Sequence, residues 1–447
     1  MKLATICLLL ILGFLEFPAS AAPVPAGVKL IKEVRLRGDV KASQYELANG
    51  LTVVLVPNRR APLTSVYHWV KAGSLQETPG ITGIAHLFEH MMFRPLAPDE
   101  PTFFMKIKKL GVSANAFTEF AMTVFTSTVP NKNLHALLEM EAARFQRLKV
   151  TPALLDVERK AVWSEYSTKM DSSPRSDLWE QIYRIAYPKH PYGWTVIGFR
   201  EDLNKIQAED CNRFFARFYR PNNTGLFIAG DIDLKQTLGW IVKNYAGWER
   251  GLDSKMPPVY TEPPKYVEAD GKVRSPARQF LMGFRIPDIK AEITPVADLA
   301  QHIFFESDYS LARRRLQHKL KYTSIISAFN SSSDNGLIKI YAVPTAGHAQ
   351  DDIRDEVLKL GEDFASLSDA EYTAYLRQYQ VGSAESVLRN ETLNSEIARS
   401  WGRYGDISYL AAELEKPPAV TRSEITEFAK KYFIKDNMVI AVTPGLE

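Results

Sequence analysis

The sequence predicts an α+β protein of two similar halves, each with an antiparallel sheet packed by helices, joined by a proline-rich linker. Strand and helix signals alternate irregularly and include a hairpin, which favours α+β over a doubly wound parallel sheet. Each half also ends in a helix, a short turn and a buried strand, at residues 215–229 and 428–442. Coincidence between two short units is the alternative. The linker, residues 251–264, reads GLDSKMPPVYTEPP, with four prolines and no periodicity.

The N-terminus has the pattern of a secretory signal peptide, residues 1–21. Lys2 supplies a positive charge, residues 3–17 are strongly apolar, and residues 19–21 read ASA, a small-x-small cleavage site. A membrane anchor needs about 20 apolar residues, more than this run contains. A mitochondrial transit peptide would be rich in Arg, which is absent here. We therefore expect export, to a bacterial periplasm rather than to the medium.

Composition and charge are those of an ordinary globular protein. Of 447 residues, 45% are hydrophobic and 24% charged, which excludes collagen-like, disordered and disulfide-scaffold classes. Lys+Arg 55 against Asp+Glu 52 indicates neither a nucleic-acid partner nor an anionic membrane surface. No later stretch has 18 uninterrupted apolar residues, so no membrane anchor is expected. Cleavage removes Cys7 and leaves Cys211 without a disulfide partner. Cys211 is expected to be structural rather than a nucleophile, because no reactive motif surrounds it.

Local patterns predict the elements within residues 28–250 and 265–447, the two halves. Asn49-Gly50 lies between apolar runs in residues 45–57, which predicts a hairpin with a tight turn. Further strands are expected at residues 65–70 and 122–129. Helical periodicity covers residues 134–148, 153–170, 206–218, 356–367 and 423–432.

The segment of chemical interest reads HLFEH, from His86 to His90. On a helix, positions four apart share a face, so both imidazoles can point at one metal ion with Glu89 beside them. Such a carboxylate can take a proton from metal-bound water. An H-x-x-[DE]-H motif arises by chance about one or two times in a hundred chains of this composition. The alternative is a helix with two satisfied histidines. The other histidines without metal-ligand spacing, expected to be surface or packed residues, are His68, His135, His302, His318 and His348.

A third ligand is expected, because catalytic zinc usually has three protein ligands and one open position. The predicted helix at 153–170 contains Glu158 and Glu165, seven residues apart and so nearly on one face. Either glutamate could complete the site. A solvated helical face is the alternative for both.

These residues resemble the inverted-zincin metallopeptidases of the pitrilysin, insulysin and mitochondrial processing peptidase family. The likeness lies in the HLFEH motif and in a glutamate 75 residues beyond His90, within an E-R-x-x-x-x-x-E run. It implies one Zn²⁺ per chain, with His86, His90 and Glu165 as ligands. Glu89 is implied as the general base, and Glu158 as a catalytic residue that supports the site from nearby.

Other segments of residues 40–235 carry the same resemblance. Residues 70–74 with Glu77 resemble the strand and glycine turn before the motif helix, and residues 190–193 with 197–198 resemble a later signature. Residues 219–231 resemble the strand that closes the first half. The N-A-x-T element implies a substrate-binding edge strand, to which an extended peptide adds as one more strand. Its residues are Asn115, Ala116, Phe117 and Thr118.

The second half departs from the family pattern. Active single-chain members carry an Arg and a Tyr there that reach across the chamber to the substrate carbonyl. The matching stretch has Gln317 at the arginine position and Thr323 at the tyrosine position. Arg313 to Arg315 and Tyr322 are possible substitutes by a register shift, and a solvated basic helix end is the alternative. The departure implies a heterodimer with a homologous chain that supplies the pair.

Together these observations predict an exported zinc metalloendopeptidase, in which Glu89 takes a proton from a zinc-activated water and returns it to the leaving amine. Its substrates are expected to be extended peptides or unfolded polypeptides. Two alternatives remain open at this point. One is a non-catalytic structural or chaperone-like subunit of the same fold, and the other is a non-peptidase metal hydrolase.

Overall fold

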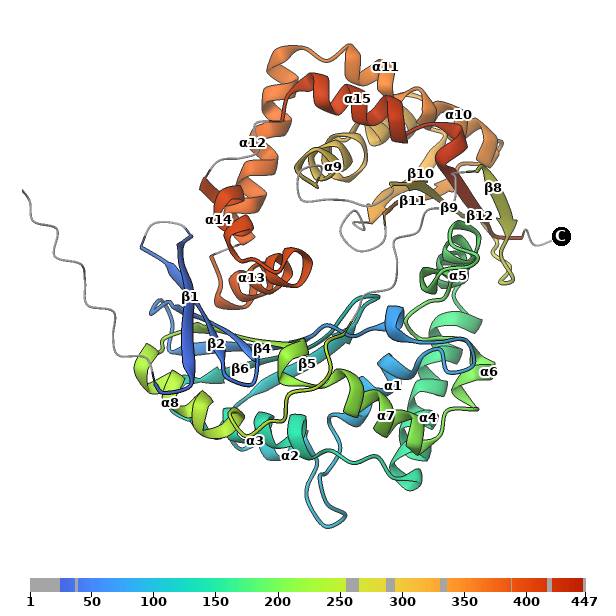
Figure 1. Cartoon of the computed structure of the whole chain (residues 1–447). Coiled ribbons are helices and arrows are strands. Elements are labelled where there is room, and N and C mark those ends of the chain that lie inside the picture. The colour runs from blue at the N-terminus through green and yellow to red at the C-terminus, as the bar shows by residue number, and fades with distance from the viewer. Residues whose placement is uncertain are drawn as a thin grey trace, which may run out of the picture.

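The computed structural model describes residues 25–36, 39–254, 265–286, 294–329, 336–386, 388–415 and 420–444. The expected signal peptide and residues 255–264 of the expected linker lie outside this part of the chain. Figure 1 shows two α+β halves, one below in blue to green and one above in yellow to red. No helix in the described ranges is both long and apolar enough to span a membrane.

Seven strands form the sheet of the first half within the described residues, in the order β1-β2-β3-β7-β4-β6-β5. The hairpin at residues 45–57 is confirmed as β2 and β3, and Gly50 adopts φ 89° in its turn. The sheet is mixed rather than antiparallel, because β7 pairs parallel with β3 and antiparallel with β4. The strands are β1 (Val28–Arg35), β2 (Lys41–Leu47), β3 (Thr52–Pro57), β4 (Leu63–Val70), β5 (Ser113–Thr118), β6 (Thr123–Pro130) and β7 (Thr224–Gly230).

A second sheet, five-stranded in the described part of the chain, has the order β10-β11-β9-β12-β8. It too is mixed, because β12 pairs parallel with β8 and antiparallel with β9. The two-half α+β prediction is confirmed, and its antiparallel detail is wrong in one strand pair of each sheet. The strands are β8 (Val267–Asp270), β9 (Phe280–Arg285), β10 (Thr323–Phe329), β11 (Leu337–Pro344) and β12 (Met438–Val442).

Helices of the first half cover one face of its sheet. Because side chains alternate along a strand, Val53 and Leu55 of β3 join the core beneath these helices, whereas Val54 and Val56 enter a different core. The helices are α1 (Ile84–Met91), α2 (Phe103–Lys108), α3 (Leu134–Arg147), α4 (Pro152–Tyr166), α5 (Pro174–Ala186), α6 (Arg200–Leu203), α7 (Ala208–Phe218) and α8 (Leu234–Tyr245).

In the second half, α9, α10, α11 and α15 share a core with its sheet. The prediction of a single helix at residues 356–367 is wrong. The helix is interrupted at Lys359, where ψ is −4°, and this residue separates α10 from α11. The helices are α9 (Thr294–Gln301), α10 (Gln350–Leu358), α11 (Leu360–Ala365), α12 (Asp369–Ser386), α13 (Asn390–Tyr404), α14 (Ser408–Glu415) and α15 (Arg422–Tyr432). Short 3₁₀ or π segments are η1 (Ser74–Gln76), η2 (Asn131–Asn133), η3 (Ser167–Asp171), η4 (Pro191–Gly193), η5 (Pro221–Asn223), η6 (His302–Glu306), η7 (Arg313–Lys319) and η8 (Lys435–Asn437).

The two halves exchange helices. Helix α13 of the second half packs on β4 and β7 of the first sheet, and α5 of the first half packs on β8, β9 and β12 of the second (Figure 1). The buried Asn394 of α13 donates hydrogen bonds to the backbone oxygens of Phe227, at 3.0 Å, and Ser65, at 3.3 Å. Each sheet therefore buries part of one face against a helix of the other half, which joins the two halves through shared cores.

Candidate metal centre

Helix α1 carries the HLFEH motif and is anchored at its N-terminus by the buried Glu77. One carboxylate oxygen of Glu77 accepts from the backbone N–H of Gly83 at 2.9 Å, and the other from that of Ala85 at 2.9 Å. The Trp194 indole N–H also donates to Glu77, at 3.0 Å. Burial raises the pKa of Glu77 to about 8, and the bonds from Ala85, Gly83 and Trp194 lower it in part. Glu77 therefore holds the first turn of α1 through these hydrogen bonds.

The structure brings His86, His90 and Glu165 together, because α1 packs directly on α4. One ligand atom from each residue lies within 4.8 Å of the other two. The Oε2 atom of Glu165 is 3.7 Å from His86 Nε2 and 3.6 Å from His90 Nε2. Two imidazole nitrogens and one carboxylate oxygen form the donor set of catalytic zinc sites that keep an open position. These residues therefore fit a zinc ion.

The local electrostatics favour the protonation states that bind metals. Burial, followed by the nearby His90, lowers the pKa of His86 to about 4. The pKa of Glu165 is lowered to about 2, first by its interaction with His90 and also by the hydrogen bond from Lys169. Burial acts in the opposite direction and raises it in part. Near neutral pH His86 is thus uncharged and Glu165 ionised, which are the forms that ligate a metal.

Glu89 lies on α1 between the two histidines, as the motif requires. It is 8% exposed, and the Thr118 hydroxyl donates a 2.6 Å hydrogen bond to its Oε2 atom. Burial raises the pKa of Glu89, and the Thr118 bond lowers it in part. A carboxylate whose pKa is raised toward neutrality is suited to accept and return a proton.

Glu158 is not in the three-residue ligand cluster but lies beside it. Its Oε2 atom is 3.3 Å from His90 Nδ1, the ring nitrogen on the other side from Glu165, and its Oε1 atom pairs with Arg94. The family resemblance implied this supporting position. Sequence reasoning missed Arg94 and Lys169, which pairs with Glu165 at 2.5 Å. For Lys169 the four-residue spacing from Glu165 was the available signal, whereas Arg94 lies beyond the end of α1 and its spacing gave none.

Residues 115–118 belong to β5, which is the edge strand of the first sheet and lies beside α1. On one side β5 pairs with β6, where Asn115 faces Thr126 and Ala116 faces Phe125. On its other side it has no strand partner within the described residues. Thr118, the last residue of β5, donates to Glu89, so this end of the strand lies beside the motif helix.

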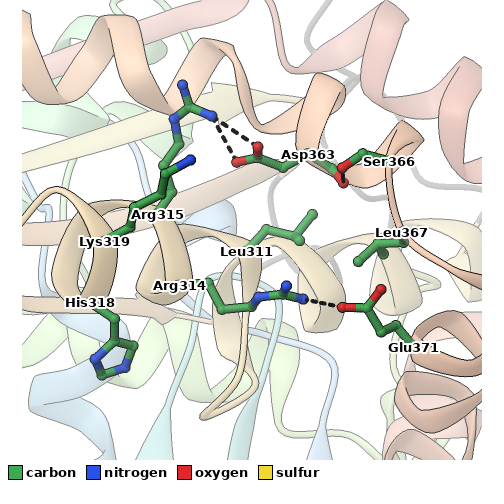
Figure 2. Close-up of a pocket in the computed structure, with 9 residues that line it drawn as sticks. All are labelled: Leu311, Arg314, Arg315, His318, Lys319, Asp363, Ser366, Leu367 and Glu371. Atoms are coloured by element: carbon green, nitrogen blue, oxygen red, sulfur yellow. Dashed lines mark hydrogen bonds and ion pairs between the residues drawn. The ribbon is translucent and has the colours of Figure 1, made fainter.

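The arginines of the basic segment in the second half, residues 313–315, form ion pairs with acidic side chains. Figure 2 shows Arg314 pointing to Glu371 and Arg315 to Asp363, at 3.1 and 2.9 Å, around a cavity of about 560 Å³. Arg313 pairs with Asp308 at 3.3 Å. Three further side chains of this segment are also in contact or buried. Gln317 donates to the Ser324 carbonyl, Thr323 is buried on β10, and the Tyr322 ring stacks on His348 at 4.0 Å.

Four of the five histidines without metal-ligand spacing pack on aromatic rings, in line with a packing role. The pairs are His68 with Phe145, His135 with Trp240, His302 with Tyr379 and His348 with Tyr322. Cys211 is buried, and burial raises the pKa of its thiol to about 12, which disfavours the reactive thiolate form. Among the residues that the structure describes, no second group of three ligand-type side chains comes together.

The H-x-x-E-H motif on α1, with Glu165 of α4 beside both histidines, is the pattern of inverzincin metallopeptidases. Residues 52–199 match the family described as insulinase (Peptidase family M16), and residues 205–379 match the Peptidase M16 inactive domain. The chain belongs to peptidase family M16. The resemblance seen in the sequence is thereby confirmed.

Similar proteins include named proteases. Zinc protease PqqE of Helicobacter pylori is 26% identical over 404 residues, which are 88% of this chain and 90% of PqqE. A probable mitochondrial-processing peptidase subunit beta of Arabidopsis thaliana is 24% identical over 427 residues, 89% of this chain and 77% of that protein. The crystal structure of a protease from Helicobacter pylori has the same fold, with a TM-score of 0.84 at 23% identity. The matched region is 92% of this chain and 100% of the Helicobacter pylori chain.

Proposed function

We propose that this protein is a zinc metalloendopeptidase that hydrolyses extended peptides or unfolded polypeptides. The observation that carries the proposal is the cluster of His86, His90 and Glu165 with Glu89 beside it. A non-catalytic structural or chaperone-like subunit is the alternative. The match to the inactive domain falls on residues 205–379, whereas all four of these residues lie in the match to the insulinase family.

His86, His90 and Glu165 would hold the zinc ion, which supplies Lewis acidity toward a water molecule and a peptide carbonyl. Glu89 accepts the proton of the attacking water and later gives it to the leaving amine. The Thr118 hydroxyl orients the Glu89 carboxylate through the 2.6 Å hydrogen bond. Glu158 holds the His90 ring from its Nδ1 side, at 3.3 Å.

The substrate is proposed to bind as an additional strand along β5, over residues 115–118. Backbone N–H and C=O groups on an open sheet edge pair with any extended peptide, whatever its side chains. This mode supports a preference for unfolded chains. It also argues against a non-peptidase metal hydrolase, which would have no use for a strand-binding edge at its metal centre.

A homologous partner chain is proposed to complete the site. The side chains at the positions of the expected Arg and Tyr are Gln317 and Thr323. The alternative cations Arg313, Arg314 and Arg315 each pair with an acidic residue of their own half. That one of the similar proteins is named as a subunit supports a multi-chain assembly. We further propose export to the periplasm, from the signal-peptide pattern of residues 1–21.

Glu89→Gln tests the function most directly. Glutamine keeps the shape of the side chain but cannot accept a proton, so peptide turnover should fall by at least about 10²-fold while zinc is retained. The measurement is hydrolysis of an unstructured fluorogenic peptide, with metal analysis of the same preparation. Near wild-type turnover in this variant would refute the assigned base. Zinc binding without turnover in the wild type, even with a partner chain, would favour the non-catalytic alternative.

A further inference from the structure

The two glutamates of α4 share one arrangement of their carboxylate oxygens. Each turns Oε2 to a histidine of α1 and Oε1 to a cation. For Glu165 the cation is Lys169, and for Glu158 it is Arg94. Each carboxylate therefore pairs with a cation through one oxygen and contacts an imidazole through the other, Glu165 at the Nε2 atoms of the ligand cluster and Glu158 at His90 Nδ1.

The two cations differ in burial. The Lys169 side chain is 64% exposed and its partner Glu165 22% exposed, so water and salt screen this pair. The Arg94 side chain is 30% exposed and Glu158 only 4%. A carboxylate as buried as Glu158 is unfavourable without a partner, because it has lost its hydration. Arg94 is thus the charge that allows Glu158 to be buried as an anion.

The consequence passes from Glu158 to the metal ligand. A carboxylate next to His90 Nδ1 accepts a hydrogen bond from that nitrogen in one tautomer only, and this tautomer leaves the Nε2 lone pair for the metal. Arg94 lies in the turn that follows α1, four residues after His90, and pairs with Oε1 of the carboxylate whose Oε2 atom faces His90 Nδ1. The three residues form a chain from Arg94 through Glu158 to His90.

We propose that Arg94 is a positioning residue that acts through Glu158 to hold His90 ready for zinc. The inference rests on the zinc site of the proposed function, and it concerns metal affinity rather than turnover. Loss of an outer partner of this kind typically lowers metal affinity by about 10- to 100-fold. Arg94 therefore belongs to the zinc site although it touches no metal.

The test measures zinc affinity by competition with a chelator, in the full chain. Arg94→Gln should bind zinc about 10- to 100-fold more weakly. Arg94→Lys should recover part of the loss, because it restores the charge but not the planar fork. The matched control is Arg184→Gln, since Arg184 also pairs with a buried glutamate, Glu180, at 2.9 Å, but on α5. This control should leave the zinc affinity unchanged.

A double-mutant cycle separates positioning from a general effect on stability. If Arg94 acts through Glu158, adding Arg94→Gln to Glu158→Gln should cause no further loss of zinc affinity. Additive losses, or wild-type affinity in Arg94→Gln, would overturn the proposal. If His86→Ala abolishes zinc binding while Arg94→Gln does not weaken it, the peptidase proposal stands and the role of Arg94 fails. A wild-type chain that binds no zinc would overturn both.

Discussion

The Thr118 hydroxyl donates a 2.6 Å hydrogen bond to the Glu89 carboxylate, which joins the edge strand β5 to the motif helix α1. The two residues are 29 positions apart in the chain. A peptide that pairs with β5 would therefore lie next to the group assigned as the base. This contact gives the first of four predictions.

Thr118→Val should move the acid limb of the rate profile to higher pH. The Thr118 bond lowers the pKa of Glu89, which burial raises, so its loss leaves the pKa higher still. Because the base must be ionised to act, activity then requires a higher pH. The measurement is kcat/KM for an unstructured peptide against pH. Thr118→Ser keeps the hydroxyl and should retain the wild-type profile, and an unshifted profile in Thr118→Val would contradict the role of this bond.

Zinc content should depend on the three residues of the ligand cluster. Purified protein is expected to hold close to one zinc per chain, and His86→Ala or His90→Ala should abolish it, because two ligands rarely hold zinc. Glu165→Gln should weaken binding, since an amide oxygen replaces a carboxylate. Metal analysis after dialysis measures the content. Full retention in both histidine variants would show that the ion, if present, lies elsewhere.

Substrate form should decide whether cleavage occurs. Binding by strand addition needs an extended backbone, so unstructured peptides should be cut, and folded proteins tied by disulfides should resist. The same protein before and after reduction and unfolding provides the matched pair of substrates. Product analysis by mass spectrometry measures the cleavage. Efficient cleavage of the rigid folded form would count against binding at the β5 edge.

The chain alone should hydrolyse peptides poorly and should gain activity with a homologous exported chain that has the Arg and Tyr. Donors aimed at the developing oxyanion contribute about 3 to 4 kcal/mol, so the gain should be about 10²- to 10³-fold. Titration of the purified chain with candidate partners, followed by peptide turnover, measures it. Full activity of the lone chain, unchanged by Arg313, Arg314, Arg315 or Tyr322 substitutions and by added partner, would refute a borrowed pair.

The sequence carried most information where spacing along one helix decides geometry. His86, Glu89 and His90 were found because a helix brings every fourth residue back to one face. Glu158 and Glu165 were both candidates by the same reasoning, and spacing could not rank them. Only the packing of α4 on α1 turns Glu165 to the Nε2 atoms of both histidines and Glu158 to His90 Nδ1.

Contacts between distant segments could not be predicted from the sequence. The bond between Thr118 and Glu89 and the pairing of Arg94 with Glu158 each join segments whose separation shows no periodicity. The exchange of α5 and α13 between the halves was not predicted either. An amphipathic helix shows in its sequence that one face is buried, but not which sheet buries it.

The sequence by itself determined the α+β class, the two-half organisation, the family and the residue types at the metal centre. These features follow from local periodicity and from a short motif whose spacing fixes its geometry. The tertiary structure decided the parallel strand pair in each sheet and which glutamate joins the histidines. It also decided which cations pair with the two glutamates of α4. Those outcomes depend on packing between elements far apart in the chain, where buried charges must find partners that local sequence does not specify.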